Sequence, residues 1–431
     1  MARPDNASVF QVSQIGVETT PGTAVPALKR LHGLSFEIAP EGDIKMFAPQ
    51  GYKFNTLAIP GKEWAGAKLS VASDYQSLAY VLDGVLMKTT PTGAGGAKTR
   101  AYTVKTNQAD TIQTYTLEHG SSLRGKRTAY NLITDFGLSA SRDEVKLDGS
   151  ALSRIITDPA YMSTCDVQSL AITGSPTGGN FTLTYATVTS GPITYNATAS
   201  NVQTALEATS SIGSGNVVCT GGPLPANPVV ITFVGALAQQ TITVLTATST
   251  LTGGTSPSTT VTSVTVGVTP TDVPAIPITP NGLDLYIDPT AAALGTTKIL
   301  RGFNLDWKIG SRFAPIWCMN STNTSWVSHV ESMPKSEFSI TLECDDEGMS
   351  YVTNQRAGTT LFIRLVSTGP AISGGGNYGF TLDFACKISK PYQYTDASGA
   401  VYAVQYGGEL VHDSTWGKAL SLTLVNTLAT L

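Results

Sequence analysis

The stretch Leu69–Leu82, LSVASDYQSLAYVL, decides the fold because its pattern returns about 270 residues later, at Ile340–Thr353, ITLECDDEGMSYVT. In both copies alternating apolar residues give way at an aspartate, Asp74 or Asp345, to helical spacing. That change of period is typical of a strand that runs into a helix. Each aspartate is a good helix N-cap, because its carboxylate accepts hydrogen bonds from the free amides of the first turn. The sequence therefore predicts two copies of one unit.

A second echo lies upstream of each copy, where Phe313-Ala314-Pro315 matches Phe47-Ala48-Pro49 at nearly the same offset. The order strand, loop, strand, helix, strands then occurs twice along the chain. We interpret the two parts as similar domains.

The composition favours a mostly β fold. Charged residues make up 13% of the 431 residues, about half the roughly 25% of ordinary soluble domains. Gly, Thr, Ser and Val are abundant, which favours short strands and turns, and the few helical stretches make the class α+β. A net charge of −4 does not indicate a nucleic-acid or anionic-membrane binder.

The charge distribution divides the chain. In the segment from Asp166 to Pro270 only Asp166 and Glu207 are charged. The alternation of apolar residues in this segment favours a small folded β-module over a disordered Ser/Thr linker. The predicted parts are an extended leading arm (1–27), a first domain (28–164), an uncharged β-module (165–270) and a second domain (271–431). The leading arm is expected to order only against a neighbouring subunit; a disordered tail is the alternative.

Strand and helix signals fill all three parts. In the first domain the predicted strands are 34–38, 44–47, 67–73, 101–106, 112–118, 128–135 and 138–147, with a helix at 74–85. In the β-module they are 181–188, 216–219, 229–234, 241–249 and 259–266, with a helix at 198–209 capped by Thr198 or Ser200. In the second domain they are 283–287, 302–309, 338–344, 360–367, 379–388, 401–411 and 420–425, with a helix at 345–355.

No pattern for catalysis or metal binding stands out. The four histidines lie far apart without a ligand at metal spacing, and the five cysteines are scattered. Asp345-Asp346-Glu347 is an acid cluster, but negative charge on a first helical turn complements the helix dipole without a metal. We predict no catalytic residue, no cofactor and no metal, and hence no enzyme.

A small basic loop, Arg124, Lys126 and Arg127, lies between two predicted strands. It is either a solvated hairpin tip or a contact loop that reaches an acidic surface of another subunit.

Both predicted domains resemble the major tail protein, the tail tube subunit of a long-tailed, siphovirus-type bacteriophage. The resemblance lies in Gly16–Ala24 (GVETTPGTA), Lys62-Glu63-Trp64, Asp74-Tyr75, Ser141-Arg142-Asp143, Gly295–Lys298 (GTTK), Gly348-Met349 and Trp416–Leu420 (WGKAL). It implies two tube-type β-barrel or sandwich modules, each with a flanking helix, that close into rings and stack into a tube.

The resemblance also implies partners and a location. The chain would assemble with itself, with three chains per pseudo-hexameric ring if both domains are tube modules, or six chains as the alternative. The tube would surround the tape-measure protein, contact tail terminator and baseplate or distal tail proteins, and let DNA pass without specific binding during ejection. Such proteins assemble in the host bacterial cytoplasm and belong to the virion tail.

The residues expected to carry self-assembly lie in the leading arm, the basic loop and one tryptophan motif. They are Val9, Phe10, Val17, Thr20, Pro21, Arg124, Lys126, Arg127 and Trp416.

The uncharged module is similar to β-modules of phage tails and bacterial surface proteins, through Gly179–Tyr185 (GNFTLTY), Ile193–Glu207, Ile231–Gly235 and Leu251–Thr255. Such modules project outward and decorate the tail exterior, and a host-surface glycan is its open candidate ligand. The alternative function for the whole chain is a secreted or cell-surface β-sandwich adhesin or glycan-binding protein. Against it, the N-terminus lacks the basic-then-apolar pattern of a secretion signal.

Overall fold

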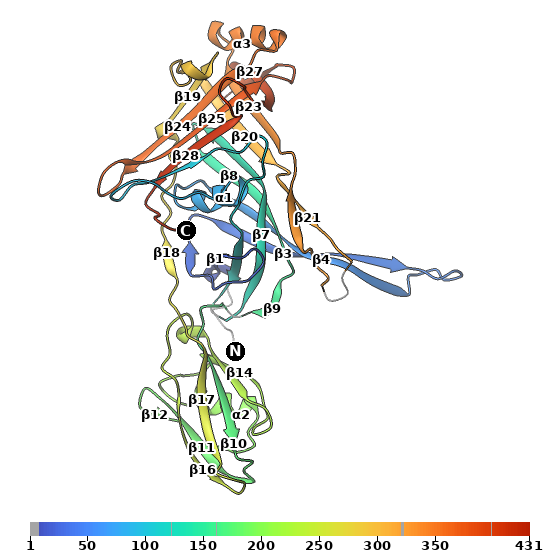
Figure 1. Cartoon of the computed structure of the whole chain (residues 1–431), viewed down its shortest axis with the longest axis vertical. Coiled ribbons are helices and arrows are strands. Elements are labelled where there is room, and N and C mark those ends of the chain that lie inside the picture. Colours follow the sequence, from blue (N-terminus) through green and yellow to red (C-terminus); the bar gives the residue numbers. More distant parts are fainter. Residues whose placement is uncertain (1–7, 122, 161, 320–322, 398) are drawn as a thin grey trace.

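The computed structural model describes residues 8–121, 123–160, 162–319, 323–397 and 399–431; residues 1–7 of the predicted leading arm lie outside the described residues. The molecule is elongated and mostly β, as predicted (Figure 1). The described part has three α-helices, α1 (Ser77–Val85), α2 (Ala199–Glu207) and α3 (Asp346–Ala357). None of these described helices is long and apolar enough to cross a membrane.

We call residues 8–165 the N-terminal half, 166–270 the middle module and 271–431 the C-terminal half. The N-terminal half contains η2 (Ser8–Phe10), β1 (Val12–Val17), β2 (Lys29–Leu31), β3 (Ser35–Phe47), β4 (Leu57–Ala72), β5 (Lys98–Tyr102), β6 (Tyr115–Gly120), β7 (Gly125–Ser141), β8 (Val145–Ser153) and β9 (Thr157–Ala160). The middle module contains β10 (Val167–Thr173), β11 (Gly178–Tyr185), β12 (Val188–Thr189), β13 (Ile193–Thr194), β14 (Val217–Gly221), β15 (Val229–Phe233), η3 (Gly235–Leu237), β16 (Thr246–Thr252) and β17 (Ser258–Thr265). The C-terminal half contains β18 (Thr271–Val273), η4 (Pro280–Gly282), β19 (Leu283–Asp288), η5 (Ala291–Ala293), β20 (Gly302–Gly310), β21 (Phe313–Ile316), β22 (Ser328–Glu331), β23 (Lys335–Glu343), β24 (Leu361–Ala371), β25 (Asn377–Lys387), β26 (Gln393–Ala397), β27 (Val401–Leu410) and β28 (Leu420–Asn426).

One antiparallel path runs through both halves, in the order β3, β4, β8, β7, β20, β23, β27, β26. A second layer, β19, β24, β25, β28 and β5, joins the path at β27. A third group, β18, β2, β1, β6 and β9, joins it at β7. The described strands form several sheets and no closed barrel, so the barrel form of the prediction is wrong. The edges of the open path stay at its two ends, since only closure would remove them.

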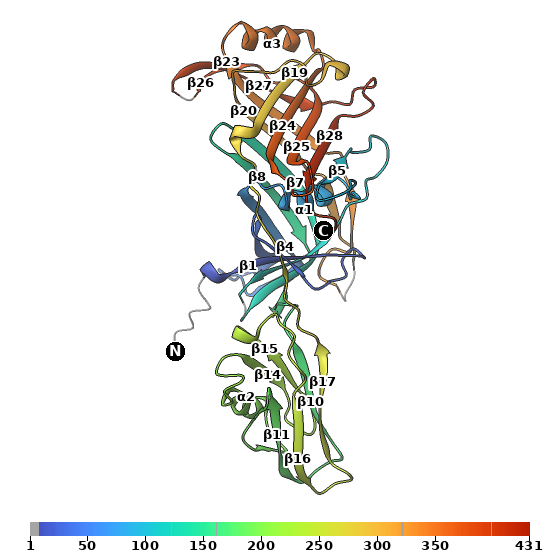
Figure 2. The same cartoon turned by 90° about the vertical axis from the view of Figure 1, so that its left-hand side faces the viewer.

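The middle module has its own sheets and its own core. β10 pairs with β15 and β17, and β14 pairs with β15, while β11 pairs with β12, β13 and β16. Its buried residues, among them Phe181, Val202 and Ile231, form a cluster separate from the core shared by the two halves. The module lies at the end of the molecule opposite α3 (Figures 1 and 2).

The strand–helix repeat is present, with the same strand order around it. β4 pairs with β3 and β8, and it leads into α1; β23 pairs with β20 and β27, and it leads into α3. The registers agree at equivalent positions: Leu69 faces Phe36 and Gly149, and Ile340 faces Leu305 and Tyr406. Strand order and register therefore agree with a duplicated unit.

Of the two predicted caps, Asp345 is confirmed as the N-cap of α3, whereas the N-cap of α1 is Gln76 and Asp74 lies two residues before it. Asp345 accepts from the Gly348 amide at 2.8 Å, and Asp74 accepts from the Ser77 amide at 2.9 Å, the same spacing in both units. Asp74 also accepts from the Gln76 amide at 2.9 Å. The regular part of α1 begins only at Ser77, three residues after the aspartate. In the middle module Thr198 caps α2, one of the two predicted cap residues.

Three further expectations are wrong. The predicted strand 138–147 is two strands, because a turn at 142–144 separates β7 from β8. Residues 12–17 do not wait for a neighbouring subunit, because β1 pairs with β2 and β6 of the same chain. The Phe-Ala-Pro echo is three positions out of register, since Phe47 occupies the place of Ile316: both lie at the outer end of paired strands, opposite Leu57 and Ser328.

Candidate assembly surfaces

The two halves of the chain meet at the antiparallel pair of β7 and β20. Trp307 of β20 faces Leu138 of β7, and both are buried. The Trp307 ring also packs edge-on against Phe136, with 5.6 Å between ring centroids. On the other face the Ser139 hydroxyl donates to the Asp306 carboxylate at 2.6 Å. A large apolar pair and one hydroxyl–carboxylate bond thus define this junction.

Two strands at the ends of the path have a single paired strand among the described residues, because β3 pairs only with β4 and β26 only with β27. On β26 the exposed Tyr394 stacks on Tyr402, with 5.3 Å between centroids. On β3 the inward residues Phe36 and Ile38 are buried. The Lys126 ammonium donates to the Ile38 carbonyl at 3.2 Å. A lysine on an edge carbonyl is one way in which a single chain protects an open edge.

Each half also carries a hairpin that extends the first two strands of its unit. The first arm is residues 44–60, the outer part of β3 and β4, and it projects away from the body (Figure 1). The second arm is residues 313–319 and 323–331, with β21 and β22, and it runs along the N-terminal half (Figure 1).

Trp326 anchors the second arm. Its side chain is fully buried, packs with Tyr130 and Leu132, and donates from Nε1 to the Ser153 carbonyl at 3.1 Å. Arg154 donates back to the Trp326 and Val327 carbonyls at 3.1 and 2.8 Å. The arm is therefore held both by burial and by satisfied backbone groups.

Further contacts hold the second arm along its length. Trp317 packs edge-on against Trp64, with 5.7 Å between centroids. At the base, the buried Arg312 pairs with Asp110 and donates to the Leu86 carbonyl at the end of α1 at 3.1 Å. His329 lies between Phe313 and Tyr130, with Nδ1 at 3.0 Å from the Tyr130 hydroxyl. Burial lowers the pKa of His329, which favours a neutral imidazole in this contact.

The first arm presents apolar side chains to solvent. The exposed members are Ile44, Met46, Phe47, Tyr52, Phe54, Leu57 and Ile59. Phe54, near the tip, is 80% exposed. Single exposed apolar residues are ordinary, but a hairpin lined with them marks an interaction surface.

The structure brings the start of the leading segment near the basic loop and places Trp416 in the other half. Val9 and Phe10 are exposed in η2, Val17 ends β1 half-buried, and Thr20 and Pro21 are exposed in a turn. Strand β1 pairs with β6 up to Gly120, and Gly120 faces Gly125 across the basic loop. Val9 and Phe10 therefore lie at the end of β1 beside the basic loop, whereas Val17, which faces Tyr115, and the turn at Thr20 and Pro21 lie at the other end of β1.

Of the other predicted contact residues, Lys126, Arg127 and Trp416 have side-chain partners within the chain. Arg127 forms an ion pair with the buried Glu118 at 2.5 Å, and Lys126 contacts β3; Arg124 is exposed. The Trp416 ring packs edge-on against Phe362, and the Lys418 ammonium lies 4.9 Å from its centroid. A direct role of these residues in assembly stays a prediction.

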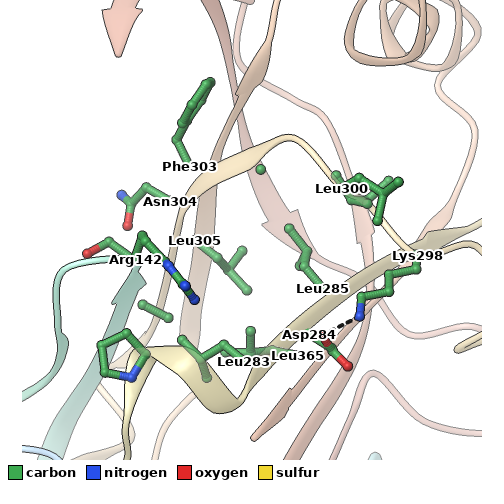
Figure 3. A pocket seen from close by; sticks show the side chains of 15 residues that line it. Arg142, Leu283, Asp284, Leu285, Lys298, Leu300, Phe303, Asn304, Leu305 and Leu365 are labelled. Atoms are coloured by element: carbon green, nitrogen blue, oxygen red, sulfur yellow. Dashed lines mark ion pairs between the residues drawn. The ribbon is translucent and has the colours of Figure 1, made fainter. Parts of the chain in front are cut away.

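A hollow of about 300 Å³ lies between the β7–β8 turn and strands β19 and β20. Figure 3 shows Arg142 and Lys298 on opposite sides of it, with the Lys298 ammonium paired with Asp284 at 2.6 Å. Two of the motifs that carry the tail-protein resemblance, 141–143 and 295–298, thus lie close together. Its lining of leucines, one ion pair and one arginine offers no set of groups for acid–base catalysis.

In the described part of the chain, no group of three or more His, Cys, Asp or Glu side chains is placed to hold a metal ion. The five cysteines are free. The acid cluster at the start of α3 has Asp345 as its cap and Arg301 as its ion partner, at 3.5 Å from Asp345 and 3.2 Å from Glu343.

The sequence reasoning missed the strand edges and both arms. Ile44, Met46 and Phe47 were recognised as part of a strand, but not as exposed. One signal was available: the first arm has apolar residues on both faces of its strands, as at Met46 and Phe47, which a strand with one solvated face does not need.

Comparison of the chain with known proteins finds similarity over only part of its length. No protein-family profile matches the chain. The chain is 37% identical over 111 residues to the tail sheath protein of Mycobacterium phage Bxz1. The match covers 26% of this chain and 18% of that protein, so the chain spans less than a fifth of the relative's length. Part of the chain resembles a bacteriophage tail protein.

Among solved structures, the chain is similar to the SPP1 tail tube, determined by solid-state NMR and cryo-EM. The match has 12% sequence identity and a TM-score of 0.25, and it covers 35% of this chain and 80% of that one. A TM-score this low supports no argument about the fold of the chain.

Proposed function

We propose that this chain is a structural subunit of a bacteriophage tail tube, and that copies of it associate head to tail into rings that stack. The similarity to a tail protein supports the tail assignment. The proposed tube role rests on one observation: two register-matched units are joined through β7 and β20, while β3 and β26 each have only one paired strand in the described chain. A chain with two unlike open edges forms heterologous contacts, which generate rings or helices.

In this proposal three chains supply the six units of each ring. The lumen would hold a tape-measure protein until DNA passes, and terminator and distal tail proteins would cap the ends. The virion tail would be the location, with assembly in the host cytoplasm. The net charge of −4 supports a wall that does not hold DNA, since phosphates are repelled by it.

Imaging of the purified full-length chain at rising concentration tests this function. We expect hollow tubes with six similar units and three middle modules per ring. Chains that stay monomeric at every concentration would overturn the tube role. Six middle modules per ring would overturn the three-chain ring.

The sheath similarity favours a second candidate, a subunit of an outer tail layer. Such a subunit requires an inner tube to assemble on. Tubes formed by this chain alone would exclude it, and assembly only on a preformed tube would support it.

We also propose that the middle module is an insertion that tube assembly does not require. Its two ends lie side by side, because the Val268 amide donates to the Thr164 carbonyl at 3.0 Å, and it has its own core. Deletion of residues 166–270, joining Cys165 to Thr271, should leave tubes intact in electron micrographs. Loss of tubes would show that the module is part of the wall. Its glycan ligand stays a prediction, which binding of the isolated module to a glycan array would test.

A further inference from the structure

We propose that β3 of one copy pairs with β26 of a second copy in the register that β20 and β7 use inside the chain. We propose in addition that the first arm seats on the C-terminal half of that second copy. The inference rests on the proposed function and names the surfaces that would join two subunits.

The first step is the equivalence of β3 and β20. Ile38 faces Ala67 of β4, and Trp307 faces Phe338 of β23. Ala67 precedes Asp74 by the same number of residues as Phe338 precedes Asp345. Ile38 therefore stands in the N-terminal half where Trp307 stands in the C-terminal half. Both side chains are buried on the core face.

The second step is the equivalence of β26 and β7 through their neighbours β27 and β8. Gly149 faces Leu69, and Tyr406 faces the equivalent Ile340, which aligns β8 with β27. Two residues before these, Leu147 faces Leu138 and Val404 faces Tyr394. Tyr394 thus takes the place of Leu138.

Together these steps give a residue-by-residue register between copies. Since Leu138 faces Trp307 inside the chain, Tyr394 of one copy should face Ile38 of the next. The predicted pairs are Ser35 with Ala397, Phe36 with Asp396, Glu37 with Thr395, Ile38 with Tyr394, Ala39 with Gln393, and Pro40 with Tyr392.

The side chains at these positions reproduce the chemistry of the internal junction. Ser139 donates to Asp306 inside the chain, and the equivalent pair between copies is Thr395 with Glu37, again a hydroxyl and a carboxylate. The buried pair Leu138–Trp307 becomes Tyr394–Ile38, again an aromatic and an aliphatic side chain. Nothing in the alignment of strands required this match, so it is independent support.

The arms agree with the same equivalence. Four facing pairs form the first arm beyond its bulge, from Ile44–Pro60 to Phe47–Leu57. Four form the second, from Phe313–Glu331 to Ile316–Ser328. Residues 57–60 of the first arm precede Asp74 by the same number of residues as 328–331 of the second arm precede Asp345. The tip residue Phe54 lies one position from the equivalent of Trp326.

A hollow lined mostly by the C-terminal half, and by residues 104–106 and 108 of the N-terminal half, lies where the N-terminal half seats an arm. The second arm lies against Lys62 and Trp64, beyond the end of β8. The equivalent residues beyond the end of β27, Met333 and Lys335, line a hollow of about 990 Å³ with Leu410. Met333 is exposed there. We assign this hollow on the second copy to the first arm of the copy that supplies β3, with Phe54 in the role of Trp326.

The two edges do not pair with each other in the described part of the chain, since β3 pairs only with β4 and β26 only with β27. The partner that we propose for each edge is therefore a second copy.

Disulfide trapping in assembled tubes tests the register. The variant Glu37→Cys with Thr395→Cys is made on a Cys318→Ser background, because Cys318 is exposed. Facing residues of an antiparallel pair lie within disulfide reach. We expect oxidation of tubes to move most chains into a ladder that ends at three chains on a non-reducing gel. Asp306→Cys with Ser139→Cys is the matched control and should link within one chain.

Each other outcome has a separate meaning. A shifted pair, Glu37→Cys with Gln393→Cys, should link at least tenfold less; equal or stronger linking would overturn the register. Tubes in which neither pair links, while the internal control does, would overturn the edge pairing and leave the proposed function standing. Absence of tubes from the unsubstituted chain would overturn the proposed function itself. A ladder that continues to six chains would overturn the three-chain ring.

Discussion

The two arms have the same strand register but different surroundings. The second arm finds its seat on the N-terminal half of its own chain, where Trp326 is fully buried. The first arm extends from the equivalent strands and presents Phe54 to solvent (Figure 1). The difference teaches that equivalent arms of a duplicated unit can differ in burial, and in our proposal the exposed arm is the one that contacts a second copy.

The equivalent helices α1 and α3 also differ in burial. All nine residues of α1 are buried, whereas only Gly348 and Val352 of α3 are. Helix α1 lies between the halves, where the Tyr75 hydroxyl preceding it meets the Ser367 hydroxyl at 2.6 Å. Helix α3 lies at the free end of the molecule (Figure 2). The halves thus share a topology, while burial follows position in the chain.

The largest expected effect comes from emptying the seat of the second arm. Trp326→Ala should lower the free energy of unfolding by about 3–5 kcal/mol, since it leaves a cavity against Tyr130 and Leu132. It also leaves the Ser153 carbonyl without its indole donor. Urea denaturation of the chain under conditions that prevent assembly measures the change.

The matched control is Phe54→Ala on the first arm. An exposed side chain away from packed features changes stability by no more than about 0.5 kcal/mol. Equal losses for the two variants would mean that the arms are not differently seated, and the comparison would fail.

The second effect is on assembly and involves the first arm alone. Phe54→Ala should raise the protein concentration needed for tubes about tenfold or more, because a buried aromatic anchor at an interface is worth 1.4 kcal/mol or more. Light scattering against concentration gives the onset. Val264→Ala, at an exposed position of the middle module, serves as control and should not move it. An unchanged onset for Phe54→Ala would remove the first arm from the interface.

The sequence predicted the repeat because its signals are local. A change from alternation to helical spacing, and an aspartate at the change, can be recognised within 14 residues. The hydrogen bonds that the Asp74 and Asp345 carboxylates accept from backbone amides followed from the same signal and are present in the structure. The mostly β class followed from composition.

Strands with buried polar residues could not be recognised from alternation. In β10 the residue Gln168 is fully buried, with its amide oxygen accepting from Leu245 at 2.9 Å. In β1 both Ser13 and Gln14 are buried. A polar residue on the core face reads as a solvent residue in the sequence, so both strands escaped prediction.

The assembly surfaces depend on partners far away in the sequence. Trp326 stands among Ser, Thr and Asn residues, and only the folded chain shows that Tyr130 and Ser153 surround it. The misplaced Phe-Ala-Pro echo has the same origin, because register is set by pairing across strands and not by a shared tripeptide. The strands at the open edges of a sheet can be identified only once the strand order is known.

A third prediction sharpens the comparison of the helices. Leu78→Ala in α1 removes a fully buried side chain and should cost about 2–5 kcal/mol of unfolding free energy. Met349→Ala, at the equivalent position of the half-exposed α3, should cost about 1 kcal/mol. Thermal unfolding of the two variants side by side measures the difference. A cost for Met349→Ala as large as that for Leu78→Ala would show that α3 contributes to a core as α1 does.

The smallest expected effect concerns the two caps and depends on pH. Asp74 is buried beside Gly33, and burial raises the pKa of its carboxyl. The folded chain therefore binds this proton more tightly than the unfolded chain. The stability that the protonated Asp74 carboxyl contributes is fully present below the ordinary pKa of about 3.9. This stability is lost as pH rises through the raised pKa of the carboxyl in the folded chain.

Asp74→Asn should remove that loss. The asparagine oxygen can still accept from the Gln76 and Ser77 amides, but the side chain carries no charge at any pH. The stability of the variant relative to the unsubstituted chain should thus rise from pH 3 to pH 7, as measured by urea midpoints. Asp345→Asn, at the equivalent but partly exposed cap, removes a surface ion pair with Arg301. The unfolding free energy of this variant should be lower by at most about 1 kcal/mol at pH 7. A relative stability of Asp74→Asn that falls with pH would mean that the buried cap is stabilised by its charge, as an exposed cap is, and the two caps would then be physically alike.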